Sequence, residues 1–114
     1  MALRADVTEL DGRPVVVLIG SVDLSTVPPL HNALTRAVVE HPGERVAVDL
    51  DGVDTLDDTG LGVLLGAAGR ARRTGGDLLI VCTNPVLLDR FRLTGLDRAV
   101  TIAPRLTAPT TDPA

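Results

Sequence analysis

The distribution of apolar residues along the chain predicts a series of β-strands. Leu3 to Leu10 alternates loosely between apolar and polar residues, and Asp11-Gly12, a pair typical of tight turns, separates it from the apolar run Pro14 to Gly20. This arrangement predicts a β-hairpin with a half-buried first strand and a central second strand. Further short apolar runs predict three more strands, at residues 45–50, 77–82 and 99–102.

Apolar residues at helical spacing predict three helices between these strands. The first begins at Ser25-Thr26 and carries Pro28 and Pro29 in its first turn, where a missing amide hydrogen is tolerated. The second covers about 58–74, and the third covers about 84–94. The expected buried side of the second helix consists of Leu61, Leu64, Leu65, Ala68 and Ala71.

The order of these elements predicts a single α/β domain. Strands lead into helices repeatedly, which implies a mixed sheet with helices on at least one face. A tight loop from Asp51 to Asp57 is expected to connect the third strand to the second helix. The domain is predicted to span residues 1–103, because a chain of 114 residues leaves no room for a second one. Residues 104–114 contain three prolines and small polar residues, so we expect a disordered tail there.

Composition and charge narrow the classes of function. Nucleic acid binding is disfavoured by a net charge of -4 and a single aromatic residue, Phe91, because such proteins use positive charge and stacking rings. The sequence shows neither a signal peptide nor a long apolar span, so we expect a cytoplasmic protein without membrane contact. Cys82 lies in an apolar run, which favours a buried thiol. His31 and His41 have no further ligands at suitable spacing, so no metal site is expected.

The most unusual segment of the chain is the acidic, glycine-rich stretch 49–62. Asp49-Leu50-Asp51-Gly52 resembles the nucleophile motif of haloacid dehalogenase-type phosphatases, in which one Asp is phosphorylated and the next but one acts as acid and base with magnesium. That enzyme class requires a larger domain and a Thr where Val53 stands, and the chain contains no Lys. We therefore favour a binding protein over an enzyme. The alternative role for Asp49 and Asp51 is a loop whose carboxylates accept hydrogen bonds from its own amides.

The start of the second helix offers a different kind of site. Asp57 or Asp58 is expected to cap the helix, since a carboxylate there accepts from free amides and faces the positive end of the dipole. Glycines within a helix cost up to about 1 kcal/mol each relative to Ala. Gly60 and Gly62 therefore predict a docking surface that another backbone can approach closely. For Gly66 and Gly69 we expect close packing of the helix on its own sheet instead.

Residues 57–66, Asp-Asp-Thr-Gly-Leu-Gly-Val-Leu-Leu-Gly, resemble the central motif of STAS domains, in particular the bacterial anti-sigma factor antagonists. Residues 20–26 resemble the Gly-x-x-Asp stretch that precedes the first helix of this family. Thr74-Gly75-Gly76 followed by a strand, and then residues 91–96, are similar to its second half. These four matches occur in the family's order and cover most of the chain.

The resemblance implies a sheet of four or five strands with helices on one face, no catalytic activity and no cofactor. In this family the antagonist binds an anti-sigma factor that is also a serine kinase. This binding displaces the sigma factor, which then starts transcription. Phosphorylation of one serine reverses this partner switching. The matching position here is Asp58, which has no hydroxyl group, so phosphorylation control is expected to be absent or altered. Three consequences are open. Asp58 imitates the phosphorylated serine in part, or the protein binds its anti-sigma factor constitutively, or the hydroxyl of Thr59 accepts the phosphate instead.

The resemblance also implies a partner surface. Asp23 and Ser25 match the loop that lies beside the phosphoacceptor in the family. The expected surface comprises Asp23, Ser25, Asp57, Asp58, Thr59, Gly60, Leu61 and Gly62. The plainer alternative for Ser25 is a helix N-cap, and for Thr59 it is a hydroxyl bonded within the first helical turn.

The assembly state and a second binding function complete the expectations. Family members commonly close with a further helix, for which the prolines after residue 103 leave little room, so we expect a monomer or a weak homodimer. A STAS subunit that docks on a transport ATPase is the alternative function, although the run 58–62 resembles that type less closely.

Overall fold

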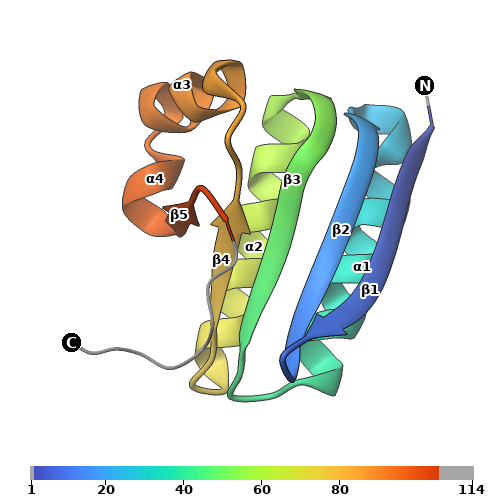
Figure 1. Cartoon of the computed structure of the whole chain (residues 1–114), viewed down its shortest axis with the longest axis vertical. Coiled ribbons are helices and arrows are strands. Elements are labelled where there is room, and N and C mark those ends of the chain that lie inside the picture. The colour runs from blue at the N-terminus through green and yellow to red at the C-terminus, as the bar shows by residue number, and fades with distance from the viewer. Residues whose placement is uncertain (1, 106–114) are drawn as a thin grey trace.

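The computed structural model describes residues 2–105, which contain one five-stranded sheet (Figure 1). Its strands are β1 (Leu3–Leu10), β2 (Arg13–Val22), β3 (Arg45–Leu56), β4 (Asp77–Val81) and β5 (Thr101–Ala103), hydrogen-bonded in that order. β1 is antiparallel to β2, and each later pair of neighbours is parallel. The predicted mixed α/β sheet is confirmed. Of the predicted tail, Pro104 and Arg105 are exposed and follow β5, and residues 106–114 lie outside the described part of the chain.

Helices lie against one face of this sheet and beside its β5 edge. A short 3-10 helix, η1 (Leu24–Thr26), leads into α1 (Val27–Glu40), which is followed later by α2 (Asp58–Arg73), α3 (Pro85–Thr94) and α4 (Leu96–Ala99). α1 and α2 pack side by side behind the sheet in Figure 1, and the face towards the viewer carries no helix. The four-residue α4 has no counterpart among the predicted helices, because so short a helix shows no apolar period.

The core lies between the sheet and helices α1 and α2. Alternate strand residues enter it, as expected for the two-residue period of a strand, and they meet helical residues spaced three or four apart. Fully buried members are Val16, Leu18, Leu30, Leu34, Val46, Val48, Leu50, Leu64, Leu78, Ile80 and Phe91. Cys82 is buried in the same cluster, and this burial raises the pKa of its thiol. Leu65 was predicted to be buried but is 43 % exposed, because it lies one position outside the buried stripe of α2.

The predicted loop from Asp51 to Asp57 is wrong. β3 continues without interruption to Leu56, because the upper half of β2 offers a parallel partner as far as the pair Val22 and Leu56. The side chains of Val53 and Leu56 are buried there, so the extension is anchored in the core. Gly52 is required at this point, since a Cβ atom would lie 2.9 Å from the carbonyl oxygen of Leu18. Long-range pairing thus overrides the local turn signal of the Asp and Gly residues.

Candidate protein-docking surface

The carboxyl ends of β2 and β3 lie next to each other and begin the two segments that the sequence singles out. The backbone amide of Asp57 donates to the carbonyl oxygen of Val22 at 3.1 Å, which joins the two strand ends. β2 leads into the Asp23 loop and α1, whereas β3 leads into α2. In a sheet of parallel strands, binding sites form outside the carboxyl ends. The topology therefore brings two segments that are more than 30 residues apart in the sequence to one edge of the sheet (Figure 1).

Asp57 is the N-cap of α2, one of the two residues that the sequence allowed. Its Oδ1 atom accepts a hydrogen bond from the amide of Gly60 at 3.0 Å, and its carbonyl oxygen accepts from the amide of Leu61 at 3.1 Å. Its extended backbone, with φ -91° and ψ 179°, is the usual conformation of a cap. Because Asp57 satisfies the helix end, Asp58 is left free to project outward from the first turn.

Asp58 is the most exposed acid of this turn, with 87 % of its side chain accessible. Its Oδ1 atom accepts a hydrogen bond from Nη2 of Arg90 at 2.5 Å, across from α3. An ion pair this exposed contributes roughly 0–1 kcal/mol to stability, so its main effect is to offset the charge of Asp58. Sequence reasoning missed Arg90, because a residue 32 positions away on another helix gives no local signal. The neighbouring Thr59 is exposed, and its hydroxyl forms no hydrogen bond within the described part of the chain.

The Asp23 loop is rigidly organised beside this turn. Oδ1 of Asp23 accepts from the Ser25 hydroxyl at 2.6 Å, the Ser25 amide at 2.9 Å and the Thr26 amide at 3.2 Å. In return, the Thr26 hydroxyl accepts from the Asp23 amide at 2.9 Å and donates to the carbonyl oxygen of Ser21. The Ser25 hydroxyl, more than the backbone amides, lowers the pKa of the Asp23 carboxyl. Asp23, and not Ser25, is therefore the N-cap at this point, and Ser25 remains exposed.

Gly60 of α2 lies against the protein's own core, although the sequence predicted a close approach by a partner. A Cβ atom on Gly60 would lie 2.5 Å from Cγ1 of Val22 and 2.6 Å from Cδ1 of Leu56, so the close approach is made by the protein's own core. Leu61 is also buried and packs inward. Both residues face the core in this structure, and a role for them in partner contact stays a prediction.

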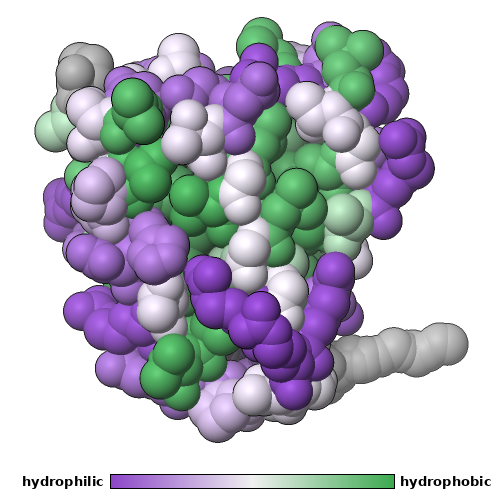
Figure 2. All heavy atoms as spheres, turned by 180° about the vertical axis from the view of Figure 1, so that it is seen from behind, coloured by the Kyte–Doolittle hydropathy of each residue, from purple (hydrophilic) through white to green (hydrophobic). Residues whose placement is uncertain are grey.

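The outward glycines of α2 lie in open space. A Cβ atom on Gly62 or Gly69 would meet nothing within 4 Å, and one on Gly66 would meet only the end of the Arg70 side chain. The expectation that Gly66 and Gly69 pack on the sheet is therefore wrong. Figure 2, which views the molecule from the helix side, shows pale and apolar residues near the centre of this face between hydrophilic ones. Gly62 thus keeps its predicted place at a surface that a partner can approach.

The two candidate phosphatase residues lie elsewhere. Asp49 and Asp51 belong to β3 on the helix-free face, and Oδ1 of Asp49 accepts from the amide of Asp51 at 2.9 Å. Oδ1 of Asp51 accepts from the amide and the hydroxyl of Thr83, at 2.7 and 3.0 Å. Within residues 2–105, no three His, Cys, Asp or Glu side chains are grouped so as to hold a metal ion. In the same range, none of the helices is both long and apolar enough to cross a bilayer.

Comparison with known proteins places this geometry in a family. The family model of the STAS domain matches residues 4–108 of the chain. This range contains all the described strands and helices, apart from Leu3 at the start of β1. The chain belongs to the STAS domain family. This STAS domain is 29 % identical to the anti-sigma-B factor antagonist of Listeria monocytogenes over 103 residues, or 90 % of each chain.

Solved structures agree with the assignment. The STAS domain superimposes on the crystal structure of an anti-sigma factor antagonist from Mycobacterium paratuberculosis with a TM-score of 0.82 and 29 % identity, covering 91 % of this chain and 87 % of the other. It also matches a Bacillus cell fate determinant in its phosphorylated form, with a TM-score of 0.65 and 16 % identity over 88 % and 91 % of the two chains. At that identity the second match shows a shared fold only.

Proposed function

We propose that this STAS domain is an anti-sigma factor antagonist that binds a serine-kinase-type anti-sigma factor and thereby releases a sigma factor. The proposal is supported by relatives that bear this name and align over nine-tenths of both chains. The observation that carries it is the exposed first turn of α2, where Asp58 projects outward beside the Asp23 loop. The protein acts in the cytoplasm through protein contact and not through catalysis.

The proposed contact surface follows from which of the predicted residues are accessible. Asp23, Ser25, Asp58, Thr59 and Gly62 are accessible at the carboxyl edge of β2 and β3, and Asp57 holds the turn in shape. Gly60 and Leu61 support this surface from the core. The small Gly62 permits a partner backbone to approach α2, and the acids attract a partner with a basic patch.

Asp58 stands at the position of the family's phosphoacceptor, so the usual phosphorylation switch is absent or altered. A carboxylate carries one negative charge, whereas phosphoserine carries about 1.5 to 2 and has more acceptor oxygens. Arg90 offsets part of the single charge of Asp58. The charge at this position therefore lies between that of an unphosphorylated serine and that of a phosphoserine, and Asp58 imitates the phosphorylated form only in part. We infer that wild-type protein binds its anti-sigma factor constitutively, and that Thr59 is the hydroxyl available for any remaining modification.

The proposal is tested by affinity capture from native lysate with wild-type protein, Asp58→Ser and the control Asp97→Ser side by side. Asp97 is an exposed acid on α4, away from this surface, and its substitution makes the same chemical change. Mass spectrometry should identify a kinase-type anti-sigma factor with wild type and with the control. Recovery by Asp58→Ser alone would mean that Asp58 holds the protein in an off state and would overturn constitutive binding. Recovery by none of the three would refute the antagonist function.

A further inference from the structure

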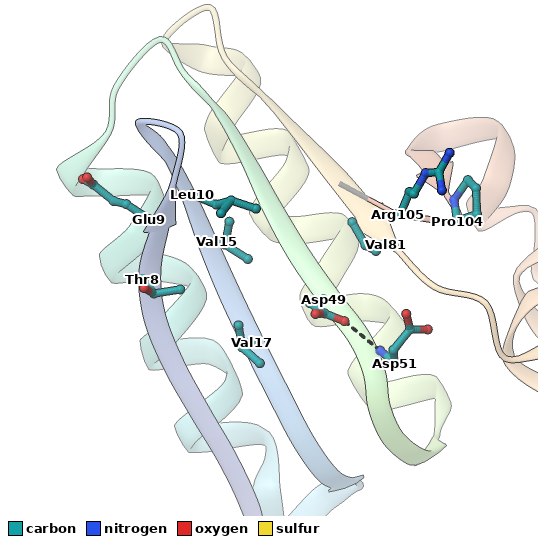
Figure 3. A pocket seen from close by; sticks show the side chains of 10 residues that line it. All are labelled: Thr8, Glu9, Leu10, Val15, Val17, Asp49, Asp51, Val81, Pro104 and Arg105. Carbon is teal, nitrogen blue, oxygen red and sulfur yellow. Dashed lines mark hydrogen bonds between the residues drawn. The ribbon is translucent and has the colours of Figure 1, made fainter. Parts of the chain in front are cut away.

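The helix-free face of the sheet contains a groove that the docking surface does not use. Its volume is about 470 Å³, and it is bounded on one side by the hairpin residues Thr8 to Leu10 and on the other by Pro104 and Arg105 (Figure 3). Val15, Val17 and Val81 form its apolar floor. Val15 and Val81 are only 7 % and 5 % exposed although no helix covers them, so the floor is recessed.

An acidic residue lies in the middle of this floor. Val17 on β2, Asp49 on β3 and Val81 on β4 are register partners and form one row across the sheet. Asp49 is half-buried and flanked by two valines, which is an unfavourable environment for a carboxylate that only supports the fold. Asp51 lies two residues further along β3 and lines the same groove (Figure 3). Two carboxylates thus face an apolar surface at one place.

Both carboxylates are held in position by the protein's own donors. Asp49 accepts from the amide of Asp51, and Asp51 accepts from Thr83, in each case through Oδ1. A carboxylate has about four acceptor positions, so these bonds leave capacity for further donors. The Glu9 carboxylate points away from the valines in Figure 3, so the acids that face the groove are Asp49 and Asp51, against one base, Arg105. Its charge therefore complements a cation.

We propose that this groove binds a small amphipathic amine. The alkyl or aryl part of the ligand lies on the three valines, and its ammonium group donates to Asp49 and Asp51. The volume falls within the range of small-molecule sites, roughly 300–1,000 Å³, which are mostly apolar with a few placed polar groups. An added peptide strand fits less well, because the strands beneath the groove already pair with neighbours on both sides and offer no free edge.

The groove is separate from the proposed protein contact. It lies on the sheet face opposite α1 and α2, whereas the contact lies at the carboxyl ends of β2 and β3. The amine and the anti-sigma factor can therefore bind independently, and the ligand test below does not depend on the proposed function.

The test uses the full chain and two probes that differ in the charge of one end group, octylamine and octanoate. Titration at neutral pH is followed by ¹H–¹⁵N correlation spectra. Octylamine should give saturable shifts at the amides of Val17, Asp49 and Val81, and Asp49→Asn should weaken binding about tenfold by removing a charge-assisted hydrogen bond. Asn keeps the acceptor for the Asp51 amide, so this variant should remain folded. The control Asp97→Asn should leave the affinity unchanged.

Several results would overturn the proposal. Equal affinity for octanoate would show an apolar surface without charge selection, and an absence of saturable shifts at the groove would show no site. Shifts with a lysine-rich apolar peptide but not with octylamine would assign the groove to a protein partner. The chain shortened by residues 106–114 is also measured without octylamine. If its groove amides show the same shifts that octylamine causes in the full chain, the chain's own C-terminal segment is the occupant.

Discussion

The substitution Gly60→Ala tests whether α2 is pressed against the ends of β2 and β3. A Cβ atom at this position would lie 2.5 Å from Cγ1 of Val22 and 2.6 Å from Cδ1 of Leu56. Val22 is 1 % exposed and β-branched, so its side chain has little freedom to move aside. Relief of the clash therefore requires α2 to move away from the sheet at the turn that carries Asp58.

The magnitude follows from two opposing terms. Replacing Gly by Ala within a helix stabilises by up to about 1 kcal/mol, and forcing an extra methyl group into a packed core costs roughly 1–3 kcal/mol. Because two side-chain atoms would lie within 2.6 Å, the packing term falls in the upper part of its range, about 2–3 kcal/mol. With a helix term of about 1 kcal/mol, we expect Gly60→Ala to lower the free energy of unfolding by about 1–2 kcal/mol. The matched control is Gly69→Ala on the same helix, where a Cβ atom would meet nothing within 4 Å. That variant should gain up to about 1 kcal/mol.

The assay is urea and thermal unfolding followed by far-ultraviolet circular dichroism, since the chain has neither Trp nor Tyr for fluorescence. At about 4 °C per kcal/mol for a domain of this size, Tm should fall by about 4–8 °C in Gly60→Ala and rise by up to about 4 °C in Gly69→Ala. If Gly60→Ala proves as stable as the wild type, or if both variants shift in the same direction, the packing argument is wrong.

Two further predictions concern the caps of this surface. Asp57→Ala should lower the free energy of unfolding by about 1 kcal/mol in urea titrations, because it removes the hydrogen bond from the Gly60 amide. Asp57→Asn retains an acceptor and should be more stable than Asp57→Ala. Equal stability of the two variants would contradict the capping role of Asp57. The lowered pKa of Asp23 favours the folded state above the ordinary Asp pKa, and this contribution is lost as pH falls through the lowered value. Ser25→Ala should raise the pKa of Asp23 in a carboxyl-carbon NMR titration, and an unchanged pKa would show that the hydroxyl is not its main cause.

Much of the fold was predictable because its signals are local. The Asp11-Gly12 turn has φ values of 54° and 78°, which only small or Asx-type residues adopt readily, and it fixes the β1–β2 hairpin. Pro28 and Pro29 lie at the start of α1, and Asp57 caps α2, as these residue types indicate. In each case the physical cause acts within a few residues of the chain, so the sequence carries it in readable form.

The candidate surface was predictable only in part, because some of its contacts join residues that are far apart in the sequence. Asp58 and Asp23 were identified from a motif, and their exposure and proximity agree with a shared surface. Nothing near Asp58 in the sequence indicates Arg90, because the contact depends on where α3 packs. Gly60 and Gly69 are the same residue on the same helix, yet one lies against Val22 and the other faces open space. Only the rotation of α2 on the sheet distinguishes them.

Backbone propensity, capping and apolar period are properties of short segments, so most element types, most of their ends and the family motif can be read from the sequence. Three facts follow only from the packing of the whole domain: β3 continues through Asp51, Arg90 reaches Asp58, and Asp49 lies between Val17 and Val81 in one groove. Each of these facts depends on the register or packing of elements that are distant in the chain. Their energy comes from contacts that no local window of sequence contains.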